Sequence, residues 1–373
     1  MHLIIFGRDA ELAKIEFSSL VDSLGIELEV AFEKENYQVV SFTKEVDARK
    51  LIDRLGGTIR IAEFIAAGEK ITPEHIEKLG FYFEDNFNYS ISGLNCSEND
   101  LDEIRQLIKS AQKKYKLRGV EKKHDDWIAT PANYSSWKLD QGFELFVLKE
   151  NGNFYLARTI VSSEPDLFTK LDNDRPTREF TRGTSFRLAR MMVNCLGLEP
   201  GMKIVDPFCG TGTFLIEGLF AGLDGVGIDN ESRMIEASKR NINWAKKKFN
   251  LRNNAELIHS DAQSAKFKAD ACVFEPYMGP FMEKLPSMEK AKKVSLELAS
   301  LYDASFSNVA KNLSVGAPVV CIIPYFETYD GKIVEVDTKF FAKNKFQPTH
   351  ERVDYDRPDK ARIRRRIYFL EKK

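Results

Sequence analysis

The sequence has few cysteines, no long apolar run and no excess of either charge. Its 5 cysteines are dispersed over 373 residues, and no two have the Cys-x-x-Cys spacing of a metal site or a redox pair. We therefore expect reduced cysteines, no structural metal and a cytoplasmic location. The apolar run from Leu3 to Phe6 is far too short to span a membrane, and the N-terminus shows no signal-peptide pattern.

The balance of charge excludes a general attraction to nucleic acid. Lys and Arg number 55 against 56 Asp and Glu, which gives a net charge of -1. Any binding to nucleic acid must therefore depend on a local basic patch. Hydrophobic residues at 43% and charged residues at 30% are typical of a globular protein, and the length allows two or three domains.

A turn that contains two glycines stands at the centre of the second half of the chain. Ile204 and Val205 predict a short buried strand, and the residues from Phe214 onward have the apolar spacing of a helix. Between them, Gly210 and Gly212 lack a Cβ atom, so a ligand can approach the backbone closely. The free N–H groups at the start of the helix can also donate hydrogen bonds to a ligand. The turn therefore predicts a site for a nucleotide-like ligand.

The residue at the head of this turn is an acid, and no lysine follows the glycines. Asp206 would repel a phosphate group, and a phosphate-binding loop of the Walker type needs the missing lysine. A positively charged ligand suits the acid better. S-adenosylmethionine, which has a sulfonium and an ammonium group, fits this requirement, whereas another nucleotide on a generic Rossmann-like turn is the alternative.

Further acids stand at the ends of the next predicted strands. Asp229 ends the strand 225–229, Asp261 with Ala262 follows the strand 254–259, and Glu275 follows Ala271–Phe274. Regular alternation of strands and helices predicts a mostly parallel sheet with both faces covered, and ligands bind beyond the carboxyl ends of such strands. We expect Asp229 to accept from ribose hydroxyls and Asp261 from an adenine amine, although each acid alone could be a helix cap.

The fourth strand end, Glu275-Pro276-Tyr277-Met278, resembles the Asp/Asn-Pro-Pro-Tyr motif of methyltransferases that modify exocyclic amino groups. Such an amine is a poor nucleophile because its lone pair is delocalised into the ring. An acidic or amide oxygen and a proline-fixed carbonyl can accept its N–H bonds, while an aromatic ring stacks on the base. Here Glu replaces Asp or Asn, and Tyr277 stands one position earlier than the motif has it. Either Tyr277 still reaches the base in an altered pocket, or the target differs, or transfer has been lost.

The first half of the chain predicts two small α+β units. Residues 1–70 alternate strand and helix signals in a split-βαβ order. In residues 71–165, Asn99 is expected to cap a helix that runs to Lys116, and Asn151-Gly152 predicts a hairpin. The outward and following positions of that helix are basic: Lys109, Lys113, Lys114, Lys116, Arg118, Lys122 and Lys123. This set could follow a phosphate backbone, but a solvated helix face explains it equally simply.

Taken together, the motifs resemble the THUMP-containing tRNA guanosine N2-methyltransferases, closest to the archaeal and eukaryotic group that acts on guanosine 10. Arg175-Pro176, the Phe180-x-x-Gly183 spacing, and residues 55–63 and 187–190 add to the likeness. The resemblance implies an α/β fold: a Rossmann-like class I methyltransferase domain preceded by a ferredoxin-like α+β unit and a THUMP-like α+β RNA-binding domain. The implied boundaries are 1–70, 71–165, a linker at 166–182, and 183–373.

The resemblance also assigns roles. Glu275, Pro276 and Tyr277 are the predicted catalytic residues, the basic set above contacts tRNA, and the arginine-rich end with Arg357, Lys360, Arg362, Arg364, Arg365 and Arg366 could line the same face or form an exposed strand edge. The residues predicted to bind S-adenosylmethionine are Gly183, Thr184, Asp206, Cys209, Gly210, Thr211, Gly212, Thr213, Asp229, Asn230, Asp261 and Ala262. Two alternatives stay open: amino methylation of another RNA such as ribosomal RNA, and a tRNA-binding protein that keeps the cofactor pocket without turnover.

Overall fold

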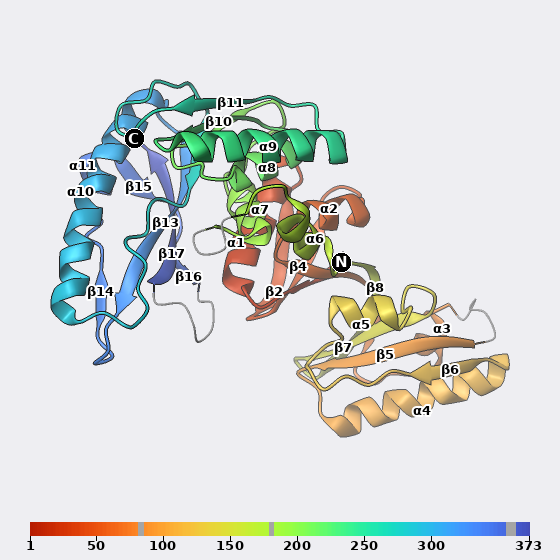
Figure 1. The fold of residues 1–373 in the computed structure, drawn as a ribbon. Coiled ribbons are helices and arrows are strands. Elements are labelled where there is room, and N and C mark those ends of the chain that lie inside the picture. The colour runs from red at the N-terminus through yellow and green to blue at the C-terminus, as the bar shows by residue number, and fades with distance from the viewer. Residues whose placement is uncertain (81–85, 179–182, 356–362) are drawn as a thin grey trace. The chain divides into compact units, whose positions relative to one another are not determined.

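Two units, each built on its own β-sheet, make up the computed structural model of the chain, which describes residues 1–80, 86–178, 183–355 and 363–373 (Figure 1). The first unit comprises Met1–Ala10 and Ile26–Leu167, and the second comprises Glu11–Gly25 and Phe168–Lys373. Helix α1 (Ala10–Ser23) therefore belongs to the second unit from Glu11 onward, although the strands before and after it belong to the first.

An eight-stranded sheet forms the first unit, in the order β2-β3-β1-β4-β8-β7-β5-β6. Its strands are β1 (His2–Phe6), β2 (Leu28–Lys34), β3 (Tyr37–Phe42), β4 (Thr58–Gly68), β5 (Asn86–Leu94), β6 (Arg118–Glu121), β7 (Phe143–Glu150) and β8 (Asn153–Ser162). The first four are antiparallel, with α2 (Ala48–Arg54) before β4, which is the predicted split-βαβ order.

The two predicted N-terminal domains share this one sheet. Strand β4, which comes before residue 70, pairs with β8, which comes after it, along most of their length. The expected boundary at residue 70 falls in the loop between β4 and α3 (Pro73–Glu77), and the division there stays a prediction. The predicted hairpin is confirmed, because β7 and β8 pair around Asn151 and Gly152, both with positive φ.

Helix α4 (Glu98–Tyr115) has its N-cap two residues before the predicted one. Its N-cap is Ser97, whose side chain accepts from the N–H of Asp100 while Asp100 accepts from the N–H of Ser97. The assignment of Asn99 as the cap was wrong, because this reciprocal capping box satisfies two backbone donors where Asn99 offers one acceptor. The apolar face of α4 is buried, with Leu101, Ile104 and Ile108 packed on the sheet.

The second unit has a mostly parallel sheet in the order β11-β10-β9-β12-β13-β17-β15, which confirms the predicted arrangement. The strands are β9 (Lys203–Asp206), β10 (Asp224–Asp229), β11 (Ala255–His259), β12 (Ala271–Phe274), β13 (Pro318–Glu327), β15 (Phe346–Pro348) and β17 (Ile363–Lys372). The first five in spatial order are parallel, and β17 lies antiparallel to β13. Two short strands, β14 (Ile333–Glu335) and β16 (Val353–Tyr355), pair with β13 and β17.

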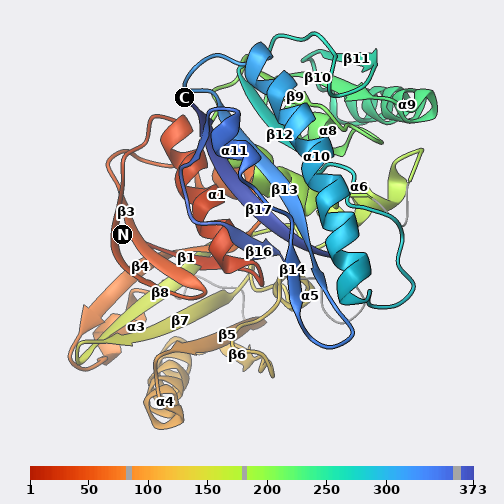
Figure 2. The same ribbon diagram turned by 90° about the vertical axis from the view of Figure 1, so that its left-hand side faces the viewer.

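Helices cover both faces of this sheet. Helices α10 (Met288–Asn312) and α11 (Phe340–Lys343) cover one face, and Figure 2 shows α10 in front of β12 and β13. Helices α1, α7 (Phe186–Asn194) and α8 (Thr213–Phe220) pack on the other face, with α9 (Ser232–Phe249) beside β10 and β11. The segment predicted as a linker, 166–182, contains helix α6 (Leu167–Asp174), which ends before Pro176.

Within the described ranges, none of the helices has an apolar stretch of bilayer-spanning length. In the same ranges, no three His, Cys, Asp or Glu side chains are grouped as metal ligands, and all five cysteines are free thiols. Three of them, Cys209, Cys272 and Cys321, are buried.

Candidate active site

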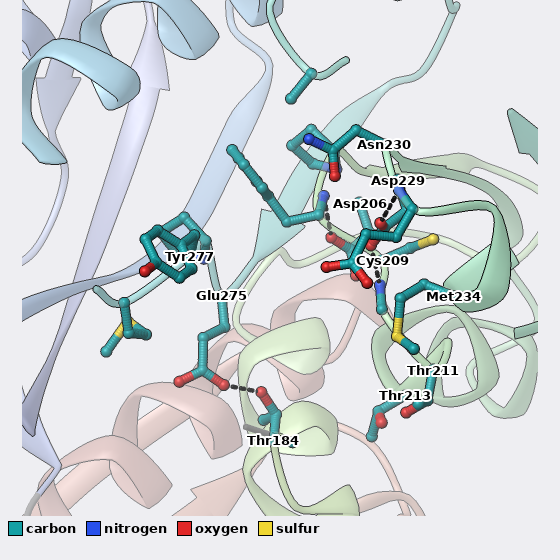
Figure 3. A pocket seen from close by; sticks show the side chains of 18 of the residues that line it. Thr184, Asp206, Cys209, Thr211, Thr213, Asp229, Asn230, Met234, Glu275 and Tyr277 are labelled. Atoms are coloured by element: carbon teal, nitrogen blue, oxygen red, sulfur yellow. Dashed lines mark hydrogen bonds between the residues drawn. The ribbon is translucent and has the colours of Figure 1, made fainter. Parts of the chain in front are cut away.

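A cavity of about 870 Å³ opens at the carboxyl ends of β9, β10 and β12. Apart from Gly212, every residue predicted to bind the cofactor or to act in catalysis lines this cavity. The predicted cofactor acids and the Glu275 loop therefore meet in one place. Figure 3 shows Glu275 and Tyr277 on one side of the cavity and Asp206, Asp229 and Cys209 on the other.

The glycine turn is held in shape by the strand beside it. Asp229 at the end of β10 accepts hydrogen bonds from the backbone N–H groups of Gly210 and Glu231, each at 2.9 Å. Cys209 donates its N–H to the carbonyl of Ile228 at 2.8 Å. Burial raises the pKa of Asp229, and the two N–H donors oppose part of that rise. Asp229 thus braces the turn, and lone pairs of its carboxylate are left for a ligand.

Helices on either side also hold the turn. Arg175, directly after α6, donates to the Thr213 hydroxyl at 2.9 Å, and Asn241 of α9 donates to the Thr211 carbonyl at 2.9 Å. Asn241 also bonds the backbone of Thr177 in both directions, at 2.9 Å each. The Arg175-Pro176 segment is therefore part of the support of the cavity.

Asp206 carries a buried carboxylate with one unsatisfied oxygen. Its Oδ1 accepts from the N–H of Phe208 at 3.0 Å, whereas Oδ2 is buried and has no hydrogen-bond partner within the described structure. Burial raises the pKa of Asp206 well above its usual range, and the negative charges of Asp229 and Glu275 raise it further. A buried acceptor without a partner is costly, and a cationic ligand in the cavity would supply what it lacks.

Gly212 is the one predicted cofactor residue that does not line the cavity. It has a φ of +85° and is the N-cap of α8. A Cβ atom at Gly212 would lie 2.4 Å from the hydroxyl oxygen of Ser238 on α9. The close approach of two helices and the left-handed backbone both require a glycine at this position, and a contact of Gly212 with the cofactor stays a prediction.

Asp261 and Ala262, which follow β11, also line the cavity. The exposed Asp261 carboxylate accepts from the N–H of Gln263 at 2.8 Å, so it caps a turn as well as lining the cavity. The carbonyl of Ala262 accepts from Asn308 at 2.9 Å, and His259 contacts the carbonyl of Asn230 at 3.1 Å. Both roles considered for Asp261 are compatible with this geometry.

Glu275 is held by a partner at each of its carboxylate oxygens. Arg365 Nε donates to Oε1 at 2.6 Å, and the Thr184 hydroxyl donates to Oε2 in a short hydrogen bond, which Figure 3 marks. All three residues line the cavity. Sequence reasoning missed the pairing of Arg365 with Glu275, because no local pattern connects residues that lie 90 positions apart.

The neighbouring arginines on β17 have other partners. Arg364 pairs with Glu327 at 3.1 Å, and Arg366 pairs with Asp354 and Glu335. These two therefore take part in ion pairs within the second unit. Arg357, Lys360 and Arg362, which were considered for the same face, lie outside the described residues, as does Phe180 of the Phe180-x-x-Gly183 spacing.

Two aromatic rings stand at the mouth of the cavity. The side chain of Tyr277 is 44% exposed, and its carbonyl accepts from the hydroxyl of the buried Tyr302 at 2.6 Å. Phe281, which the sequence interpretation did not single out, is 67% exposed and also lines the cavity. Either ring is accessible to an entering base, so the displaced tyrosine of the motif is not the sole aromatic available.

The predicted RNA-contacting residues lie in the first unit, in the second half of α4, on β6 and directly after each of these elements. All of them are exposed except Lys122, which is half-buried. Lys114 forms an ion pair with Glu77 and lies over the ring of Tyr115. Strand β6 is an edge of the eight-stranded sheet, so this basic group borders an open edge.

A family model described as "RMKL-like, methyltransferase domain" (UPF0020) matches residues 175–273. This segment begins directly after α6 and ends in β12, so it contains the glycine turn, Asp229 and Asp261. The match confirms a methyltransferase domain in this part of the chain.

Relatives and solved structures extend the likeness to the whole chain. The tRNA (guanine(10)-N2)-dimethyltransferase of Methanothermobacter thermautotrophicus is 25% identical over 93% of this chain and 94% of its own length. That of Methanocaldococcus jannaschii is 28% identical over 51% of this chain and 53% of its own length.

Among solved structures, TrmN from Thermus thermophilus matches with a TM-score of 0.54 and 14% identity, covering 100% of this chain and 99% of that chain. It shares the fold, which confirms the predicted class I methyltransferase architecture. The named relatives confirm the resemblance that the motifs indicate, whereas the THUMP-like character of the first unit stays a prediction.

Proposed function

We propose that this chain, a class I methyltransferase similar over nearly its whole length to tRNA (guanine(10)-N2)-dimethyltransferases, methylates the exocyclic N2 amine of a guanosine in tRNA. The observation that carries the proposal is the cavity, in which the unpartnered carboxylate oxygen of Asp206 and the paired carboxylate of Glu275 face one ligand space. A cation and an amine are the two ligands that such a space suits.

S-adenosylmethionine is the cofactor, and when bound it supplies a methyl group on a positively charged sulfur. The residues present fit it. Asp206 offers a buried anionic acceptor, and Asp229 and Asp261 line the same cavity with carboxylates at consecutive strand ends. Such acids attract the positive charges and hydroxyl groups of the cofactor, and they would repel the phosphates of a dinucleotide.

Glu275 is the acceptor that prepares the target amine. Each of its oxygens can accept two hydrogen bonds, and Arg365 and Thr184 occupy one at each oxygen. The carboxylate therefore keeps the capacity to accept N–H groups of the amine, while its own position is fixed. Polarising those N–H bonds makes the nitrogen lone pair more available and stabilises the positive charge that develops on the nitrogen.

Pro276 and Tyr277 complete the amine side of the cavity. The carbonyl of Pro276 is the second acceptor for the amine, and the half-exposed ring of Tyr277 gives the base a surface on which to stack. A base inside a helix would have to leave its stack to reach this cavity. The basic residues of α4 and β6 supply the electrostatic attraction for the tRNA backbone.

The test is methyl transfer from labelled S-adenosylmethionine to an unmodified tRNA transcript, followed by nucleoside analysis of the product. We expect N2-methylguanosine or N2,N2-dimethylguanosine, most directly at position 10. Glu275→Ala should lower the rate by about 10²- to 10⁴-fold, the range for loss of an acid–base or amine-orienting group, without abolishing cofactor binding measured by calorimetry.

Glu297→Ala, which removes an exposed carboxylate on α10, is the matched control and should leave the rate unchanged. An unchanged rate in Glu275→Ala contradicts the catalytic role. Two other outcomes decide between the alternatives. Methylation of ribosomal RNA in preference to tRNA changes the substrate. Binding of cofactor and tRNA without any methyl transfer would show that the chain is a tRNA-binding protein without turnover. The altered Glu275-Pro276-Tyr277-Met278 motif is the reason to test this outcome.

A further inference from the structure

We propose that Arg365 is a specificity-determining residue, which together with Glu275 reads the Watson–Crick edge of guanine. The inference rests on the proposed function, and it goes beyond it by assigning the base selectivity to one ion pair. Arg365 donates to the O6 atom of guanine, while the two oxygens of Glu275 accept from N1–H and N2–H.

The pair is placed for this by the sheet. Glu275 follows β12, Arg365 lies on β17, and β13 runs between them, with Arg365 opposite Pro324 of β13. Their Nε and Oε1 atoms are 2.6 Å apart, and both side chains line the cavity. The side chains are 18% and 6% exposed, so the pair is largely enclosed yet open to the cavity.

The guanidinium of Arg365 has N–H donors that are not used by its bond to Glu275. Only its Nε is bonded to Glu275, and in the part of the chain that the structure describes its two terminal nitrogens have no hydrogen-bond partner. Its neighbours differ in this respect, because Arg364 and Arg366 use terminal nitrogens to bind Glu327 and Glu335. A guanidinium has five N–H donors in a fixed fork, so four remain for a ligand beside the carboxylate.

Together the two side chains present a donor followed by two acceptors. Starting at Arg365, the order is guanidinium, Oε1 and Oε2, and Thr184 fixes Oε2 from the far side. The edge of guanine has the complementary order: the acceptor O6, then the donors N1–H and N2–H. Adenine has an amine, then the N1 acceptor, then C2–H, so it would place its amine against the guanidinium and its N1 lone pair against Oε1, and it would leave Oε2 without a donor.

The direction of the base follows from its attachment. The N3 side of guanine bears the ribose and must lead out to the RNA chain, so the O6 end is the one that can reach the enclosed ion pair.

The order also explains why a glutamate can stand where the motif has Asp or Asn. A carboxylate paired with an arginine carries little net charge, but it still offers two acceptor oxygens.

The experiment compares two substrates and two enzymes. The target guanosine of a synthetic tRNA is replaced by 2-aminopurine, which keeps the amine but lacks O6 and N1–H, and kcat/KM is measured for both substrates with wild type and Arg365→Met. A hydrogen bond to a charged group corresponds to about 10- to 100-fold in rate. We expect Arg365→Met to lower kcat/KM for guanosine by about 10- to 100-fold more than it lowers kcat/KM for 2-aminopurine.

The comparison separates specificity from positioning. If Arg365 acts only by holding Glu275, both substrates lose the same factor, and this overturns the proposal. Arg364→Met, which changes the adjacent arginine that pairs with Glu327, should leave the ratio between the substrates at its wild-type value. Arg365→Lys, which keeps one donor, should restore part of the guanosine rate.

A measurement on wild type alone covers the case in which Arg365→Met does not fold. With 2,6-diaminopurine at the target, an amine replaces O6 and would face the guanidinium. Transfer should then be slower than to 2-aminopurine, and an equal or faster rate contradicts the O6 contact. If wild type transfers no methyl group to guanosine at all, the proposed function fails, which is a different result from transfer with unchanged selectivity.

Discussion

At the scale of single residues, Asp206 connects the stability of the protein with cofactor binding. Its carboxyl has a pKa well above the usual value because of burial, so between the unfolded and folded pKa values the folded state binds more protons than the unfolded state. The stability that this group contributes is therefore lost as the pH rises through that interval. A bound cation offsets the free-energy cost of ionising the buried Asp206 carboxyl, because it favours the ionised carboxylate.

We therefore expect Asp206→Asn to have opposite effects on the two properties. Without cofactor, the gain in unfolding free energy over wild type should grow as the pH rises above about 4, where an unfolded aspartate ionises. At the same time, affinity for S-adenosylmethionine should fall about 10- to 100-fold, because a charged hydrogen bond is lost. Denaturant unfolding at several pH values and calorimetric titration measure the two effects.

Asp270→Asn is the control for both measurements. Asp270 is exposed and accepts from the N–H of Lys203 at 2.8 Å, at the amino ends of β9 and β12, whereas the cavity lies at their carboxyl ends. It should change neither the cofactor affinity nor the pH dependence. A stability difference for Asp206→Asn that does not change with pH would show that its carboxyl is not held in the protonated form. Cofactor binding should also tighten with rising pH in wild type, because the cation displaces a proton.

At the scale of elements, the turn between β9 and α8 divides its two glycines between two tasks. Gly210 lines the cavity and donates its N–H to the Asp229 carboxylate, whereas Gly212 lies against α9. Both have positive φ, and Gly212 also has Ser238 in the space that a side chain would need. The hydroxyl of Ser238 is buried and has no partner in the described part of the chain, so its own loss costs little.

A double-mutant cycle tests this packing. Gly212→Ala should lower the unfolding free energy by about 2–4 kcal/mol, the sum of a left-handed alanine and an overpacked contact. Ser238→Ala alone should leave the unfolding free energy nearly unchanged. In the double variant it should remove the part of the loss that comes from the overpacked contact, so that only the cost of the left-handed alanine remains. Denaturant unfolding of the four proteins gives the coupling energy. Additive losses would show that Gly212 does not depend on Ser238.

Periodicity in the sequence was sufficient to predict the parallel strands, their end acids and the hairpin at Asn151-Gly152. These features depend on neighbours a few positions apart, such as alternating burial and turn residues. The capping of α4 was missed because two residues, Ser97 and Asn99, both suit a cap, and only the reciprocal bond of Asp100 distinguishes them.

Other features were beyond local patterns. The Arg365–Glu275 pair depends on which strands become neighbours, and the short strands β14 and β16 depend on pairing with β13 and β17. The role of Gly212 depends on a helix that begins twenty residues later, at Ser232. In each case the deciding contact is set by tertiary packing, which the composition of a short window does not contain.

At the scale of the whole molecule, attraction to RNA has to arise against a nearly neutral background, because the net charge is -1. The exposed basic residues at the end of α4 therefore carry this role in the proposed function. Lys109, Lys113 and Lys116 follow one another at helical spacing, and all three are exposed. They belong to the first unit, whereas the cavity belongs to the second.

Replacing these three lysines by glutamine should weaken tRNA binding by about tenfold or more and reduce the slope of log affinity against log salt by about 2, because fewer counterions are released. Affinity for S-adenosylmethionine should not change, since the cavity is built from the second unit alone. Lys266, Lys268 and Lys311, which are exposed in the second unit, form the matched control set, and Lys268 and Lys311 line one small pocket with Lys203 and Asp270. Their replacement by glutamine removes the same charge and should leave the salt slope at its wild-type value. Equal losses from both sets would mean that total charge governs binding, and no loss from the α4 set would make it the solvated helix face that its sequence equally allows.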